Sequence, residues 1–97
     1  MNLNFRAIGP EPAKNFEAEF ETTSNFNLHI ERTETGRITV WQRTGESGEY
    51  SLISGFGNRD SQKIIDVDCT AAVWPKSIKV VSETMPHIAS VTFAQQV

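Results

Sequence analysis

The amino-acid sequence predicts an all-β protein, a single-domain, two-layer antiparallel β-sandwich of about eight short strands over residues 1–97. Hydrophobic and polar residues alternate along much of the chain, and turn-forming residues interrupt the alternation about every ten to twelve positions. The β-branched residues Ile, Val and Thr number 8, 7 and 9, whereas Leu occurs 3 times. Branched side chains favour strands over helices, so composition and periodicity agree. Immunoglobulin-like and jelly-roll sandwiches both fit this pattern.

The first two strands are predicted at residues 2–8 and 15–22. In the first, Leu3, Phe5 and Ala7 share one face, and prolines at positions 10 and 12 then end the strand. In the second, three apolar residues alternate with three glutamates. A short helix over residues 12–22 is the alternative, because the phenylalanines are four apart and proline suits a first helical turn.

The most regular local pattern predicts a hairpin between strands at residues 26–31 and 37–43. The connection Thr33-Glu34-Thr35-Gly36 fits a type I turn followed by a left-handed glycine. This register pairs residue 33 with 37 and residue 29 with 41. It also places Ile38 opposite Arg32 on the inner face.

The second half of the chain predicts four more strands. Gly45-Glu46-Ser47-Gly48 fits a four-residue turn into a strand at residues 49–54, which pairs Thr44 with Glu49 and sets Ile53 beside Val40. The same register places Tyr50 and Leu52 on the outer face. The last three strands are expected at residues 63–69, 76–83 and 87–94.

Catalytic, metal and cofactor motifs are absent from the sequence, so we expect a non-enzymatic protein without a cofactor. The single cysteine, Cys69, falls on an inner strand face, where a thiol packs as a small apolar side chain. Asp66 and Asp68 share one face of a strand, and a solvated face explains this pair better than a calcium site does. The glycines at positions 55 and 57 begin a nucleotide-loop pattern that is not completed.

Charge and hydropathy exclude two classes of partner. The net charge of −3 argues against nucleic acid, which requires a basic surface. No apolar run is long enough to span a bilayer, and residues 1–6 lack the features of a signal peptide. We therefore expect either a protein that stays in the cytoplasm where it is made or one whose signal segment was removed before residue 1. The acids are concentrated between Glu11 and Glu34, which suggests either a solvated strand face or a surface complementary to a neighbouring copy.

The predicted register gathers aromatic and cationic residues on one outer surface, a composition typical of protein-binding hot spots. Its members are His29, Arg37, Trp41, Arg43, Tyr50 and Leu52. We expect this surface to bind other protein subunits in a homo-oligomer or larger assembly, such as a virion, as a capsid-decoration or head–tail component. The alternative is a carbohydrate-binding or adhesin-type module in which Trp41 and Tyr50 stack on a sugar. A third reading covers the surface with the protein's own chain, for example around Trp74.

Overall fold

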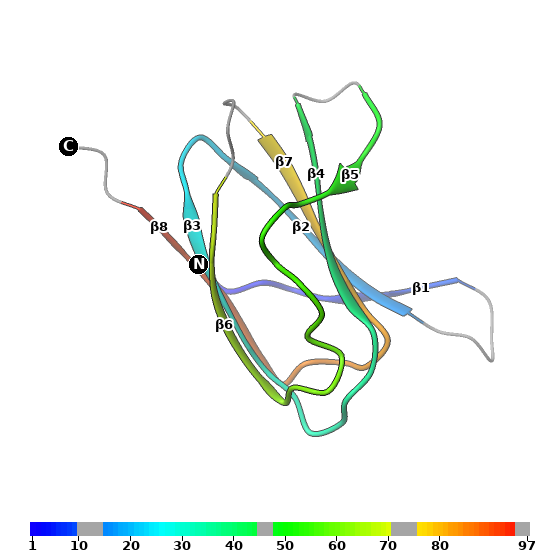
Figure 1. Cartoon of the computed structure of the whole chain (residues 1–97). Helices are drawn as coiled ribbons and strands as arrows, with labels where there is room; N and C mark the ends of the chain where they lie inside the picture. The colour runs from blue at the N-terminus through cyan, green and yellow to red at the C-terminus, as the bar shows by residue number, and fades with distance from the viewer. Residues whose placement is uncertain (10–14, 45–47, 71–75, 95–97) are drawn as a thin grey trace.

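The computed structural model describes residues 1–9, 15–44, 48–70 and 76–94, which form eight strands in two antiparallel sheets (Figure 1). The larger sheet has the order β1-β2-β7-β4-β5 and the smaller sheet the order β6-β3-β8. The strands are β1 (Arg6–Ile8), β2 (Asn15–Thr22), β3 (Phe26–Glu31), β4 (Ile38–Thr44), β5 (Ser51–Leu52), β6 (Ile64–Cys69), β7 (Lys76–Ser82) and β8 (Ile88–Phe93). The predicted all-β fold is confirmed, and residues 15–22 form a strand rather than a helix.

The core lies between the two sheets and follows from the period-2 alternation of each strand. Leu28 and Ile30 of β3, Ile65 of β6 and Ile78 of β7 are completely buried. Burying each such side chain contributes roughly 1.5–3 kcal/mol relative to leaving it exposed. An edge-to-face contact of 5.1 Å between the ring centres of Phe20 and Phe26 joins β2 of one sheet to β3 of the other.

The predicted hairpin between residues 26–31 and 37–43 is wrong. Strand β3 pairs with β6 and β8, whereas β4 pairs with β7 and β5, so the connection between them crosses from one sheet to the other. Gly36 does not adopt the left-handed conformation that the hairpin required, since the glycines with positive φ are Gly9, Gly48, Gly55 and Gly57. The local sequence pattern is compatible with a hairpin, but contacts with residues distant in the sequence direct the chain into the other sheet.

Those contacts centre on Arg32, which is 2% exposed at the start of the connection. Its guanidinium donates to the backbone oxygens of Gln62 at 2.8 Å, Gly36 at 2.9 Å, Arg59 at 3.0 Å and Asp60 at 3.1 Å. Burial lowers the pKa of Arg32, and the charges of Asp60 and Glu83 oppose that shift. A cation bonded to the segment before β6 holds this connection across the end of the sandwich.

The predicted pairing of the fifth strand is confirmed in register and shortened in length. Trp41 lies opposite Leu52, and the Ile53 N–H donates to the Val40 oxygen at 2.9 Å, as a four-residue turn requires. Strand β5 itself covers only Ser51–Leu52 instead of residues 49–54. The large sheet therefore ends in a very short edge strand.

The N-terminal segment is predicted as one strand but pairs with both sheets. Near its start, the Leu3 N–H donates to the Ala89 oxygen at 2.9 Å and the Val91 N–H to the Met1 oxygen at 2.8 Å, alongside β8. Further on, β1 pairs with β2 of the larger sheet. Leu3 is buried in the core, whereas Ala7, predicted on the same face, is exposed. This segment closes one side of the sandwich, as its course in Figure 1 shows.

The connectivity differs from that of an immunoglobulin domain. In that fold the fifth strand lies between the second and the fourth, whereas here β7 occupies this place. In the part of the chain that the structure describes, no helix is long and apolar enough to cross a membrane.

Candidate functional site

The outer face of the larger sheet brings together four of the six predicted surface residues. Trp41 and Arg43 point outward from β4, and Leu52 lies opposite Trp41 on β5. The same register continues to Tyr50, whose ring lies 4.7 Å from the Arg43 guanidinium carbon. The prediction that these side chains gather on one outer surface is confirmed.

A fifth residue, Lys79 of β7, belongs to this group. Its Nζ lies 4.2 Å from the centre of the Tyr50 ring, and its backbone lies opposite Trp41. We call Trp41, Arg43, Tyr50, Leu52 and Lys79 the Tyr50 cluster. The sequence indicates that Lys79 points outward, because Ile78 and Val80 point inward. That β7 lies beside β4 is a long-range feature that no local pattern contains.

The ring of Tyr50 is held by two cations, each at a distance typical of cation–π attraction. Burial raises the pKa of the Tyr50 hydroxyl, and the negative charge of Glu19 adds to that shift. The hydroxyl therefore stays protonated near neutral pH, and the cluster presents a neutral phenol between two positive charges.

The cluster is open to solvent at Leu52, which is 58% exposed. Trp41 is half-buried, and its indole N–H donates to Thr39 Oγ1 at 2.9 Å. No other described part of the chain covers Leu52 completely, so an apolar part of this surface is exposed. Trp74, suggested from the sequence as such a cover, lies outside the described residues.

His29 and Arg37 are not part of the cluster, because they were placed there by the incorrect hairpin. His29 lies on the outer face of the smaller sheet, opposite Asp66 and Ser90. Arg37 is exposed in the connection between the sheets, where its backbone exchanges hydrogen bonds of 2.9 Å with Glu83. The single six-residue surface is thus corrected to a four-residue one.

The outer face of the smaller sheet is polar and carries three carboxylates. His29 Nε2 lies 2.9 Å from Glu31 Oε2, and its Nδ1 lies 3.5 Å from Asp66 Oδ2. The hydrogen bond to Glu31 is the main cause that raises the pKa of His29. Asn27 donates to Asp66 at 2.7 Å and to Asp68 at 3.0 Å, and its bond to Asp66 is the main cause that lowers the pKa of Asp66.

Asp66 and Asp68 share one face, as predicted, and Asn27 bridges them. Across residues 1–9, 15–44, 48–70 and 76–94 no group of three or more His, Cys, Asp or Glu side chains has an arrangement that could hold a metal ion. Two isoleucines that were not among the predicted surface residues, Ile64 and Ile88, lie on either side of Glu31 on this face and are exposed. The alternation in the sequence places both isoleucines on the outer face, and this is the signal that could have identified them.

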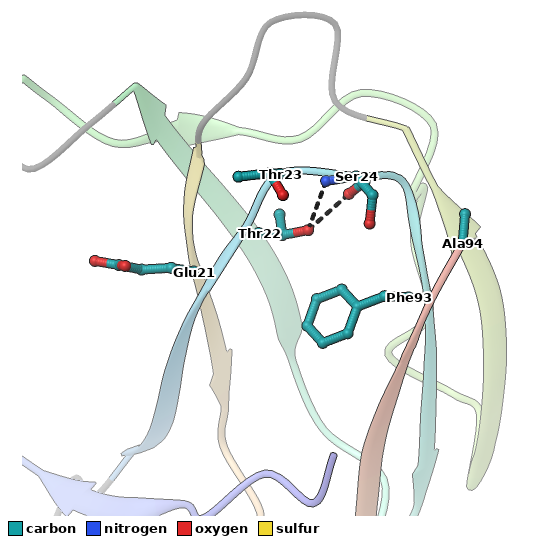
Figure 2. A pocket seen from close by; sticks show the side chains of 6 residues that line it. All are labelled: Glu21, Thr22, Thr23, Ser24, Phe93 and Ala94. Carbon is teal, nitrogen blue, oxygen red and sulfur yellow. Dashed lines mark hydrogen bonds between the residues drawn. The ribbon is translucent and has the colours of Figure 1, made fainter. Parts of the chain in front are cut away.

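One end of the sandwich is hollowed around Phe93. A pocket of about 340 Å³ is lined by Glu21, Thr22, Thr23, Ser24, Phe93 and Ala94. Figure 2 shows that Glu21 points away from the Phe93 ring, while Thr22 Oγ1 accepts from the Ser24 N–H at 3.1 Å and donates to its backbone oxygen at 2.7 Å. The hydroxyl of Thr22 is thus already engaged in a local turn.

A second hollow of about 410 Å³ lies on the other side of Phe93 and includes Cys69. The thiol is buried on the inner face, as predicted, and burial raises its pKa to about 11. A thiol with such a pKa is protonated at neutral pH and is a poor nucleophile. His29 projects from the opposite face of the smaller sheet, so it does not activate Cys69.

Comparisons with protein-family models, with curated proteins and with solved structures found no significant match.

Proposed function

We propose that this protein is a non-enzymatic subunit of a larger assembly, such as a virion, and that it binds neighbouring copies of itself through the Tyr50 cluster. The observation that carries the proposal is the exposed Leu52 beside two half-buried aromatic rings and two cations. Tyrosine, tryptophan and arginine are the residues most enriched in protein-binding hot spots. Covering Leu52 in a contact removes apolar surface from water.

Pre-organisation of the cluster favours binding. Arg43 and Lys79 already hold the Tyr50 ring, and Thr39 already holds the indole of Trp41. Side chains that are fixed before binding lose less conformational entropy when the contact forms. The cluster therefore offers a rigid aromatic surface with one apolar side chain at its edge.

The charge pattern of this face suits a pairing of two copies. Glu19 and Glu21 are exposed on β2, while Arg43 and Lys79 lie on β4 and β7. In a two-fold contact the same face of both copies meets, so each side of the contact carries both glutamates and cations, which favours pairing of opposite charges across it. Glu17 of the same row is already paired with Arg6 at 2.7 Å.

The carbohydrate-binding alternative has weaker support. A sugar stacked on Trp41 and Tyr50 also needs side chains that hydrogen-bond its hydroxyls, and His29, predicted beside these rings, lies on the other sheet. The Tyr50 ring also has two cationic partners already. The assembly role is favoured over a sugar site for these two reasons.

Sedimentation velocity over a wide concentration range tests the proposal. We expect the protein to self-associate and Leu52→Asp to weaken that association at least tenfold, because it buries a carboxylate against apolar surface. Ile64→Asp is the matched control, because Ile64 is a similarly exposed residue on the other sheet, and we expect it to associate as the unmodified protein does.

A protein that stays monomeric at every concentration would overturn the proposal, as would equal effects of the two variants. Titration of the monomer with a panel of soluble sugars, followed by tryptophan fluorescence, then decides whether the carbohydrate alternative takes its place.

A further inference from the structure

Most edges of the two sheets are protected, and they are protected in different ways. Residues 1–3 pair with the outer edge of β8, and β1 and β5 cover only three and two residues. The Ile38 N–H at the edge of β4 donates to Asp60 Oδ1 at 3.2 Å, which occupies it. Short strands and capped donors are the usual protections of sheet edges.

Strand β6 (Ile64–Cys69) has the longest edge without such protection; residues 18–22 of β2, beyond the pairing with β1, form a shorter one. Strand β6 lies at the edge of the smaller sheet, has six residues and pairs with β3 along its whole length. Within the described residues its other edge has no backbone partner. In the view of Figure 1 the connection from β5 to β6 passes between β6 and β4, and within the described residues it makes no backbone hydrogen bond to β6. An open edge of this length has a row of unpaired N–H and C=O groups available to another chain.

We propose that β6 binds an extended, cationic segment of a different protein, which adds a fourth strand to the smaller sheet. The unpaired backbone supplies the hydrogen bonds of this binding mode. Asp66 and Asp68 favour a cationic segment, because a lysine or arginine opposite each carboxylate forms a favourable cross-strand pair. Ile64, 63% exposed at the start of the strand, offers an apolar contact to the same segment.

A second copy of this chain is a poor occupant of the edge. In a two-fold antiparallel pairing centred on Asp66, that carboxylate lies opposite its own counterpart. In the pairing centred on Val67, Asp66 lies opposite Asp68 of the other copy. Like charges directly opposite each other destabilise a sheet, so the two longest symmetric registers are both disfavoured.

The two carboxylates are held in place from the neighbouring strand β3. Asn27 on the neighbouring strand donates to both of them, at 2.7 Å and 3.0 Å. Glu31 adds a third negative charge to the same face, and His29 lies between it and Asp66. The inference is independent of the Tyr50 cluster, which lies on the other sheet, so either proposal can fail alone.

Synthetic peptides of alternating lysine and valine test this inference, with NMR of the isotope-labelled full chain as the measurement. We expect the largest shifts and the strongest new protection from hydrogen exchange at β6 amides. N-methylation of the alternate peptide amides that face β6 should abolish binding, whereas N-methylation of the other set should not. A peptide with glutamate in place of lysine should not bind.

Two double variants isolate the charges. Asp66→Asn with Asp68→Asn keeps an oxygen acceptor for Asn27 and should weaken binding of the lysine peptide about tenfold. Glu19→Gln with Glu21→Gln removes the same number of charges from the larger sheet and should leave the affinity unchanged. Absence of binding, equal binding of both N-methylated peptides, or equal effects of the two double variants would overturn the proposal.

Discussion

Two connections of equal length, residues 32–37 and residues 45–50, have opposite outcomes in this fold. Both contain turn-forming residues between strands of alternating pattern, and the sequence predicts a hairpin at each. The second connection joins β4 to β5 within one sheet, whereas the first carries the chain from β3 to β4 across the sandwich. The difference lies in Arg32, because the first connection begins with a buried cation that bonds to residues 59–62.

The comparison teaches that agreement between register and hydrophobic pattern does not identify a hairpin. The predicted register required an arginine on the inner face opposite Ile38, which is an unfavourable place for an unpaired charge. The inward position of this arginine is explained by the observed structure, in which four backbone oxygens surround its guanidinium. A charged residue at a predicted inner position is therefore a reason to test a cross-sheet path.

The largest expected effect is that of Arg32→Ala. It removes the donor from four backbone oxygens, and we expect the free energy of unfolding to fall by about 4 kcal/mol. Arg32→Lys, with three donors, should lose about half as much. Urea denaturation measures both, and Arg37→Ala is the control, because its side chain is exposed in the same connection. A similar loss in Arg32→Ala and Arg37→Ala would contradict the role assigned to Arg32.

A smaller effect on stability is expected at Asp60, which accepts hydrogen bonds from the same connection. Its carboxylate accepts from the Ile38 N–H, and its backbone oxygen accepts from Gly36 and Arg32. Asp60→Ala should lower the free energy of unfolding by about 2 kcal/mol, since it leaves a part-buried donor unpaired. Asp60→Asn keeps an acceptor and should lose less. Equal losses in thermal denaturation would show that the hydrogen bond to Ile38 contributes nothing.

The smallest effect is expected from replacing one glycine in each of the two connections. Gly48 has a φ of +126°, which strains any other residue, so Gly48→Ala should lower the free energy of unfolding by about 1 kcal/mol. Gly36 has an ordinary φ, and an added Cβ would lie 3.2 Å from Glu83 Cβ. Gly36→Ala should cost less because it adds no backbone strain and needs only a small shift to relieve the tight contact with Glu83 Cβ. The reverse order in matched urea titrations would restore the left-handed turn predicted at Gly36.

Local sequence patterns predict the strands well, because burial on one face imposes a period of two on each strand. Residues 15–22 and 26–31 form strands with the predicted bounds, and β6, β7 and β8 differ from prediction by a residue at one or both ends. The order of strands in each sheet is absent from these patterns, since it depends on contacts between residues far apart in sequence. The prediction therefore missed β7 as the neighbour of both β2 and β4.

The residues of the candidate surface show the same contrast between local and long-range contacts. Trp41, Arg43, Tyr50 and Leu52 are joined by a short turn, and the sequence places them correctly. His29 was placed on this surface by the predicted hairpin that begins after Arg32, and it lies on the other sheet. Lys79 was missed because only the position of β7 brings it to the Tyr50 ring.

The pairing of the N-terminal segment with β8 has a consequence for how the chain reaches its structure during synthesis. Met1 and Val91, which exchange hydrogen bonds, are 90 positions apart in the sequence. Residues 1–3 must therefore wait until nearly the whole described chain has been synthesised before their partner strand exists. Until then Leu3 has no core to enter, and the edge it later covers is unformed. Folding of this domain is expected to finish late and in a single step, with slow closure of this long-range contact.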